Sequence, residues 1–350
     1  MKEFQQVTEK TRKGRYFKGP VFAVAPMIDW TDRHCRYFHR QISGRALLYT
    51  EMVVADAIIH GVRDRLLGHH DCENPLALQL GGSDPAKLAE AVRIASEYGY
   101  DEINLNVGCP SDRVQSGTFG ACLMREPATV AECVQAMRAV ASVPVTVKCR
   151  IGVDDQDPEA VLPDFLDRVI DAGADGVWIH ARKAWLQGLS PKENREIPPL
   201  DYGVVYRMKE RHPDVFIGIN GGIADLDAAV EHLRHVDGAM LGRAVYHNAA
   251  LLADVDRRIY GAPERTTDWD VVRDAMIAYA AGHIAGGGRL VHVTRHMVGL
   301  FAGVAGSRRY RQILSADATK PGAGPEVIGE AFAAIDFDAP VRQTAAAPAA

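Results

Sequence analysis

The chain has 350 residues, of which 47% are hydrophobic and 24% charged, and its formal net charge is −5. This balance is that of an ordinary globular protein with room for about two domains, and the acidic net charge argues against gross, non-specific affinity for nucleic acid. No window of the sequence reaches the ~18 uninterrupted apolar residues of a membrane span, and Met1 to Pro20 lacks the apolar core of a secretory signal. Six scattered cysteines form no C-x-x-C pair, so no metal site is signalled and we expect reduced thiols in a cytoplasmic protein.

Short apolar runs of strand type alternate with segments of helical spacing from Val21 to about Tyr260. The expected helices include Asp84–Tyr98, which follows a Ser-Asp-Pro start signal, and Asp164–Ala172. Eight strand–helix units predict an α/β fold, a (β/α)8 TIM barrel, with a doubly wound sheet as the main alternative. The predicted strands are Val21–Met27, Leu47–Met52, Pro75–Leu80, Glu102–Val107, Val143–Cys149, Gly176–His180, Val215–Asn220 and Gly238–Leu241.

The barrel is favoured because nearly every apolar run ends in polar, glycine-rich or reactive residues. In a barrel, all eight strand ends meet on the face that carries the site. After Tyr260 the pattern becomes helical, most clearly at Val271–Ala281 and Leu290–Phe301, which predicts a small all-helical C-terminal domain. We therefore predict an N-terminal extension (1–19), a catalytic barrel (20–260), a helical domain (261–335) and a disordered Ala/Pro-rich tail (336–350).

The fourth predicted strand runs directly into Gly108-Cys109-Pro110. Glycine permits backbone angles that other residues avoid, and proline fixes the chain just beyond the thiol. A cysteine held rigidly at a strand end is placed for chemistry. The competing interpretation is a small buried hydrophobic residue, which is the common role of a free cysteine.

Polar residues also end the first, third, fifth and sixth predicted strands. Pro26 either stiffens a binding turn or simply ends its strand, and Gln79 needs a hydrogen-bond partner that could be a flavin or a neighbouring backbone group. Lys148 is of a type rarely buried without an anionic partner, such as a reduced flavin. His180 either flanks the same ligand or is a core histidine.

The seventh and eighth predicted strands end in Asn220-Gly221-Gly222 and Gly242-Arg243. Barrels commonly bind phosphate with the loops after these two strands. Glycines let backbone N–H groups approach the anion, and an arginine adds a forked, charged contact. The pattern therefore predicts a phosphate site.

Taken together, these segments resemble the tRNA-dihydrouridine synthase family, in its A-type branch. The matching motifs cover about residues 20 to 315, and the run from Gly188 to Asp201, which contains Ser190–Arg195, resembles that branch in particular. The matching motifs are Ala25-Pro26-Met27, Asp29–Arg33, Gln79–Gly82, Asn104–Pro110, Val147–Gly152, His180–Ala184, Asn220–Ile223 and Gly242–Ala244.

The resemblance implies a barrel that binds FMN and a helical domain that binds tRNA. The implied activity is the NADPH-driven reduction of uridine in the tRNA D-loop, at positions 20 and 20a for this branch, with Cys109 as the proton donor. Asn106, Lys192 and Arg195 would contact tRNA. The residues implied to contact FMN are Pro26, Met27, Ile28, Gln79, Lys148, His180, Asn220, Gly221, Gly222, Gly242 and Arg243.

Two other functions remain open on the sequence. A flavin barrel acting on a free small molecule would share the phosphate site but would not need the helical domain. An RNA-binding protein built on a decayed barrel would give no reason for Cys109, Lys148 and Gly242-Arg243 to occur together. We expect neither a metal nor a membrane as a partner.

Overall fold

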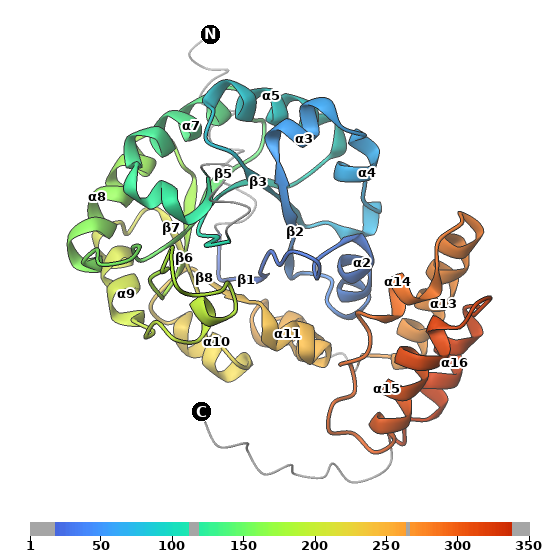
Figure 1. Cartoon of the computed structure of the whole chain (residues 1–350). Coiled ribbons are helices and arrows are strands. Elements are labelled where there is room, and N and C mark those ends of the chain that lie inside the picture. Colours follow the sequence, from blue (N-terminus) through green and yellow to red (C-terminus); the bar gives the residue numbers. More distant parts are fainter. Residues whose placement is uncertain (1–17, 112–118, 264–266, 338–350) are drawn as a thin grey trace. The chain divides into compact units, whose positions relative to one another are not determined.

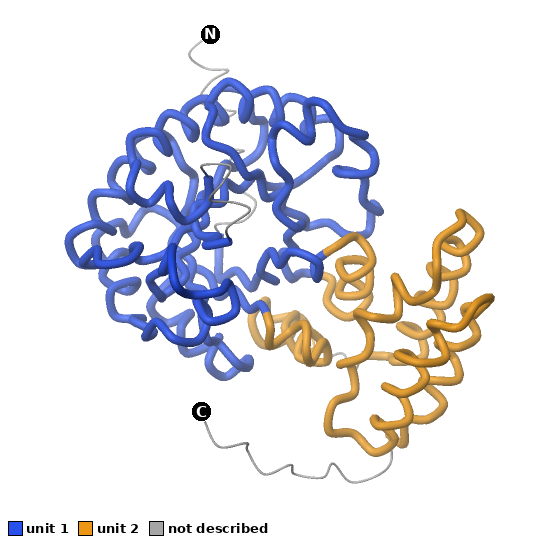
Figure 2. The backbone as a smooth tube through the Cα atoms, in the orientation of Figure 1, with its two compact units in different colours: residues 1–31, 45–242 blue, residues 32–44, 243–350 orange. Residues whose placement is uncertain are grey.

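The computed structural model describes residues 18–111, 119–263 and 267–337. The predicted extension (1–19) and tail (336–350) lie almost wholly outside these residues. The chain forms two compact units, here called unit 1 (1–31 and 45–242) and unit 2 (32–44 and 243–350) (Figure 2). The predicted domain boundaries stay a prediction, because the units group residues by contact and not by independent folding.

Unit 1 is a closed barrel of eight parallel strands in sequence order, with helices around it (Figure 1). The predicted TIM barrel is therefore confirmed, and closure of the sheet excludes the doubly wound alternative. The first strand is shorter than predicted because Pro26 has no N–H to continue the ladder. The strands are β1 (Val21–Val24), β2 (Leu47–Val54), β3 (Leu76–Gly81), β4 (Glu102–Val107), β5 (Val145–Arg150), β6 (Gly176–His180), β7 (Phe216–Asn220) and β8 (Gly238–Leu241).

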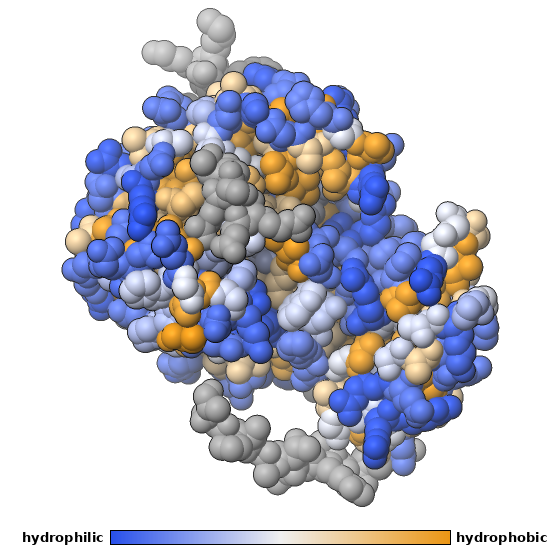
Figure 3. Space-filling model, in the orientation of Figure 1, coloured by the Kyte–Doolittle hydropathy of each residue, from blue (hydrophilic) through white to orange (hydrophobic). Residues whose placement is uncertain are grey.

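Aspartate caps set where α5, α8, α9 and α10 begin. Asp84 accepts from the N–H groups of Ala86 and Lys87, and α8 starts earlier than predicted because Asp157 caps it. Hydrophilic residues prevail along the outer rim of α5, α7 and α8 (Figure 3). The helices of unit 1 are α3 (Ala55–His60), α4 (Arg63–Leu67), α5 (Pro85–Ala95), α7 (Pro127–Val140), α8 (Pro158–Asp171), α9 (Tyr202–Arg211) and α10 (Leu226–His232).

Large aromatic side chains fill the barrel interior where β7 and β8 carry glycine. Trp178 on β6 is buried and meets Phe216 edge to face, with ring centroids 5.1 Å apart. A Cβ on Gly218 would lie 2.2 Å from the Trp178 ring, and one on Gly238 would lie 2.6 Å from it. Glycine on β7 and β8 is therefore what makes room for the indole.

Unit 2 is helical, and no strand occurs among the described residues from 267 to 337. The helix predicted over Leu290–Phe301 is shorter, ending at Thr294. The chain turns beyond it, and Gly299 packs so closely that a Cβ would lie 2.4 Å from the carbonyl oxygen of His247. The helices are α2 (Arg33–Ile42), α11 (Arg243–His247), α12 (Val255–Arg258), α13 (Trp269–Ala285), α14 (Leu290–Thr294), α15 (Ser307–Ala316) and α16 (Glu326–Ala333).

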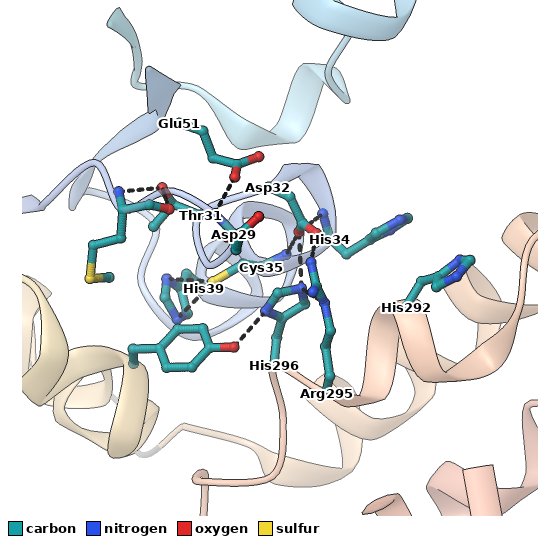
Figure 4. Close-up of polar contacts among 12 residues, drawn as sticks. Asp29, Thr31, Asp32, His34, Cys35, His39, Glu51, His292, Arg295 and His296 are labelled. Carbon is teal, nitrogen blue, oxygen red and sulfur yellow. Dashed lines mark hydrogen bonds and ion pairs between the residues drawn. The ribbon is translucent and has the colours of Figure 1, made fainter. Parts of the chain in front are cut away.

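Asp32 joins the start of α2 to a distant segment of unit 2. It caps α2 through the N–H groups of His34 and Cys35, and it pairs with Arg295 (2.6 Å) and the buried His296 (3.0 Å) (Figure 4). Burial alone would raise the pKa of Asp32, but these hydrogen bonds and charges outweigh it and hold the pKa below its usual range. These contacts give Asp32, within the motif Asp29–Arg33, a structural role.

No helix in the described part of the chain is long and apolar enough to cross a membrane.

The glycine beside Trp178 gives a test of the barrel packing. Gly218→Ala should lower the free energy of unfolding by at least about 1–3 kcal/mol, because the methyl group overlaps the indole ring. Gly282→Ala in α13 should instead stabilise by about 0.5–1 kcal/mol, since nothing lies within 4 Å of that position and alanine favours helix. Urea denaturation measures both. A neutral Gly218→Ala would show that the indole can move aside.

Candidate active site

The carboxyl ends of the barrel strands carry the residues predicted to form the site. Lys148, His180 and Asn220 lie at or near the ends of β5, β6 and β7, and strand pairing places His180 directly beside Asn220. Gln79 is buried within β3, and Gly242 follows β8. The fold thus brings these residues to one end of unit 1, as the barrel predicted.

Lys148 is a buried cation held by a neutral partner. Its Nζ donates to Oδ1 of Asn220 (3.1 Å), and Nδ2 of Asn220 donates to the carbonyl oxygen of Met240 (2.7 Å). Among the described residues, no carboxylate forms an ion pair with Lys148. Burial, with the charge of Arg150 adding to it, lowers the pKa of Lys148 to about 8. An anionic ligand would offset this cost.

The two glycine turns lie close to neighbouring side chains. Gly221 and Gly222 both have positive φ, and a Cβ on Gly221 would lie 2.6 Å from the His180 ring. A Cβ on Gly242 would lie 3.2 Å from the sulfur of Met27. Positive φ therefore favours glycine at the first turn, whereas a side chain at Gly242 would require Met27 to shift by a few tenths of an ångström.

The remaining predicted cofactor residues differ in their surroundings. Pro26 and Met27 after β1 are half-buried, whereas Ile28 is 49% exposed. Arg243 begins α11 and belongs to unit 2. The cofactor roles of all these residues stay predictions.

The thiol of Cys109 lies in a segment fixed on both sides. Oδ1 of Asn106 accepts from the N–H groups of Gly108 (3.1 Å) and Cys109 (3.0 Å). From the other side, Nε of Arg150 donates to the carbonyl oxygen of Gly108 (3.1 Å). Cys109 itself is half-buried, so the thiol is neither a core residue nor freely exposed.

Arg150 and Asn194 are structural residues of the site that the sequence reasoning missed. The buried guanidinium of Arg150 also donates to the carbonyl oxygens of Lys183 (3.1 Å) and Asn194 (3.0 Å). The side chain of Asn194 closes its loop by donating to the carbonyl oxygen of Trp185 (2.8 Å) and accepting from its N–H (2.7 Å). Arg150 thereby ties the Cys109 segment to the loop that follows β6.

That loop carries the residues predicted to bind tRNA. Lys192 and Arg195 flank Asn194 and are exposed, whereas Asn194 is fully buried. Trp185 on the same loop is 40% exposed, and an open pocket of about 600 Å³ lies between it and Arg125. The buried asparagine thus anchors a loop that exposes two cations.

Within residues 18–111, 119–263 and 267–337, no group of three or more His, Cys, Asp or Glu side chains is arranged to hold a metal ion.

Comparison with known proteins shows to which family the chain belongs. The model of the dihydrouridine synthase (Dus) family matches residues 23–335. The chain belongs to the dihydrouridine synthase family. Several family members named tRNA-dihydrouridine(20/20a) synthase resemble it over nearly their full length. Those of Shewanella oneidensis and Xanthomonas campestris are each 56% identical, covering 91% of this chain and 95% and 94% of the relatives.

The Escherichia coli tRNA-dihydrouridine(20/20a) synthase is 53% identical over 95% of this chain and 96% of its own length. The resemblance to the A-type branch of the dihydrouridine synthases is therefore confirmed.

The buried charge of Lys148 should cost stability when no anion is bound. Lys148→Met should raise the free energy of unfolding of the apoprotein at pH 7 by about 1–3 kcal/mol, because the pKa of about 8 lies below the unfolded value of about 10.4. The unfolded chain binds the proton more tightly, so the gain is full below pH 8 and disappears toward pH 10.4. Urea denaturation at several pH values measures it.

Lys87→Met is the matched control, because it removes an exposed lysine from α5. It should change the free energy of unfolding by less than about 1 kcal/mol. A Lys148→Met apoprotein less stable than the parent at pH 7 would contradict a costly buried charge.

Proposed function

We propose that this protein reduces uridine to 5,6-dihydrouridine in tRNA, with bound FMN and with NADPH as the reductant. Membership in the dihydrouridine synthase family supports the reaction. The observation that carries the assignment is Cys109, held at the end of β4 by Asn106 and Arg150 on the barrel face where the buried cation Lys148 also lies.

The residues at the strand ends fit FMN, which has a planar ring and a phosphate group. Lys148 is a buried cation that needs an anion, and the amides of Gln79 and Asn220 offer donors and acceptors to a planar ring. The positive-φ turn at Gly221-Gly222 follows β7, where barrels commonly bind phosphate, and glycine lets backbone N–H groups approach an anion. We assign FMN contacts to these residues and to Pro26, Met27, Ile28, His180, Gly242 and Arg243.

When bound, FMN supplies the hydride that uracil needs at carbon 6, with electrons that come from NADPH. The protein supplies the proton at carbon 5, and Cys109 is the acid we assign to that transfer. Its fixed backbone keeps the thiol in one place, as general acid catalysis requires. The resulting thiolate regains its proton from water, so one uridine is reduced per NADPH oxidised.

The substrate is held by basic residues on the loop after β6. Lys192 and Arg195 are exposed beside the buried Asn194, where they can meet phosphate groups. The target base has to leave its stack to reach the barrel mouth, and Asn106 is proposed to contact it. By its relatives' names, the target is uridine 20 or 20a of the D-loop. Thiols that form no disulfide within the described residues, together with a tRNA substrate, favour the cytoplasm as the location.

Cys109→Ala tests the proton donor. The variant should keep FMN and be reduced by NADPH at the normal rate, while dihydrouridine formation falls about 100- to 10,000-fold, the usual cost of losing a positioned acid. Cys122→Ala is the control, because Cys122 is another half-buried thiol of unit 1. Stopped-flow flavin absorbance separates the two half-reactions. Normal dihydrouridine yield from Cys109→Ala disproves the role.

The Lys192→Ala/Arg195→Ala double variant tests the tRNA surface. It should weaken tRNA binding and lower the slope of log affinity against log salt by about one to two units, because each lost phosphate contact removes about 0.7–0.9. Arg93→Ala/Arg168→Ala on α5 and α8 removes two exposed arginines elsewhere and should leave the slope unchanged. Binding measured across a salt series decides. Unchanged affinity and slope would favour a free small-molecule substrate.

A further inference from the structure

The inward face of β4 carries three polar residues inside the barrel. Glu102, Asn104 and Asn106 occupy alternate positions, so they point to the same side of the strand, and all are at least 92% buried. Buried polar groups are costly unless they are paired. Their partners therefore determine how each side chain is oriented.

A continuous chain of hydrogen bonds joins these residues, and every donor in it points the same way. Nδ2 of Asn106 donates to Oε1 of Gln79 (2.8 Å), and Nε2 of Gln79 donates to Oδ1 of Asn104 (2.8 Å). Nδ2 of Asn104 donates to Oγ1 of Thr146 (2.8 Å), whose hydroxyl donates to Oε1 of Glu102. The chain runs from the strand ends to the opposite end of the barrel and stops at a carboxylate.

Glu102 is suited to end the chain as an acceptor. The hydroxyl of Tyr49 also donates to its Oε1. Strand pairing puts Ala77 between the two residues, and its small side chain leaves the space that the phenol crosses. Burial raises the pKa of Glu102 to about 7, opposed by the two hydroxyl donors. An ionised carboxylate can only accept, so it accounts for the shared direction of the donors.

The other end of the chain is the Cys109 segment. Because Nδ2 of Asn106 donates to Gln79, its Oδ1 faces the N–H groups of Gly108 and Cys109. A reversed Asn106 would present its NH2 group to those two N–H donors and lose both hydrogen bonds. The position of the thiol thus depends on the orientation of this amide.

We propose that Glu102 is a positioning residue that fixes the orientation of Asn106, and so the position of Cys109, through this chain. The proposal rests on the proposed role of Cys109 in proton transfer. A glutamine at position 102 carries its own N–H donors, so Thr146 can accept from residue 102 and donate to Asn104 instead. The hydrogen bonds within the neutral chain can then form in either direction, but only the original direction holds the Cys109 segment.

The test is the alkylation rate of Cys109 by iodoacetamide in the apoprotein, followed by mass spectrometry. At about pH 8.5 thiols react as thiolates and Glu102 is ionised. Glu102→Gln should raise the rate about threefold to tenfold, the effect of losing one or two net hydrogen bonds. Cys72 and Cys122 are half-buried thiols that serve as internal references and should not change.

Tyr49→Phe is the matched control, because it removes a donor to the same carboxylate without breaking the chain to Asn106. It should leave the Cys109 rate at the parent value. Asn106→Ala should raise the rate at least as much as Glu102→Gln does. The double variant should be no faster than Asn106→Ala, since both changes act through one chain.

Thr146→Val breaks the chain at a second point and covers the case in which Glu102→Gln does not fold. It should also raise the Cys109 rate about threefold or more. Parent-like Cys109 rates in the folded Glu102→Gln or Thr146→Val protein overturn the proposal, as do additive effects with Asn106→Ala. Since alkylation needs neither flavin nor tRNA, this outcome is independent of whether the parent protein makes dihydrouridine.

In the loaded enzyme, Glu102→Gln should slow the step in which tRNA reoxidises the flavin and should leave flavin reduction by NADPH unchanged. A loss confined to flavin reduction would place the effect of Glu102 at the cofactor and overturn its assignment to Cys109.

Discussion

The need to pair the buried polar groups of β4 inside a closed barrel governs how the candidate site is built. β4 places a carboxylate and two amides on its inward face, and each is hydrogen-bonded to side chains on β2, β3 or β5. Because these partners are directional, the amides adopt one orientation rather than two. The last acceptor available, Oδ1 of Asn106, meets the backbone that carries Cys109. The position of the Cys109 segment therefore depends on hydrogen bonds made inside the barrel.

Two buried cations serve this end of the barrel in different ways. Arg150 donates to three backbone carbonyl oxygens and so joins the Cys109 segment to the loop after β6. Lys148 instead donates to one neutral amide, and burial lowers its pKa because the charged form is unfavourable there. A protein that keeps such a charge gives up stability at a site that needs an anion. The first cation is structural, and the second is suited to a ligand.

Unit 2 is assembled from segments that are far apart in the sequence. It contains α2, which follows the first barrel strand, together with α11 and the helices of the C-terminal region. Asp32 makes this grouping concrete, because one carboxylate caps α2 and pairs with Arg295 and His296. His296 in turn is hydrogen-bonded to Tyr246 on α11 (3.2 Å). Helices of the first and last barrel units thus belong with the C-terminal region.

The sequence by itself determined the strands, the barrel and the residues at the strand ends, because apolar runs, helix caps and glycine-rich turns are local signals. It did not identify Glu102, Arg150 or Asn194 as supports of the site, and it extended the helix that ends at Thr294. Their partners lie on other strands and loops, so only the closed fold brings them within hydrogen-bonding distance. Residue type and spacing indicate where chemistry can occur, whereas the orientation of each side chain depends on contacts that form when the barrel closes.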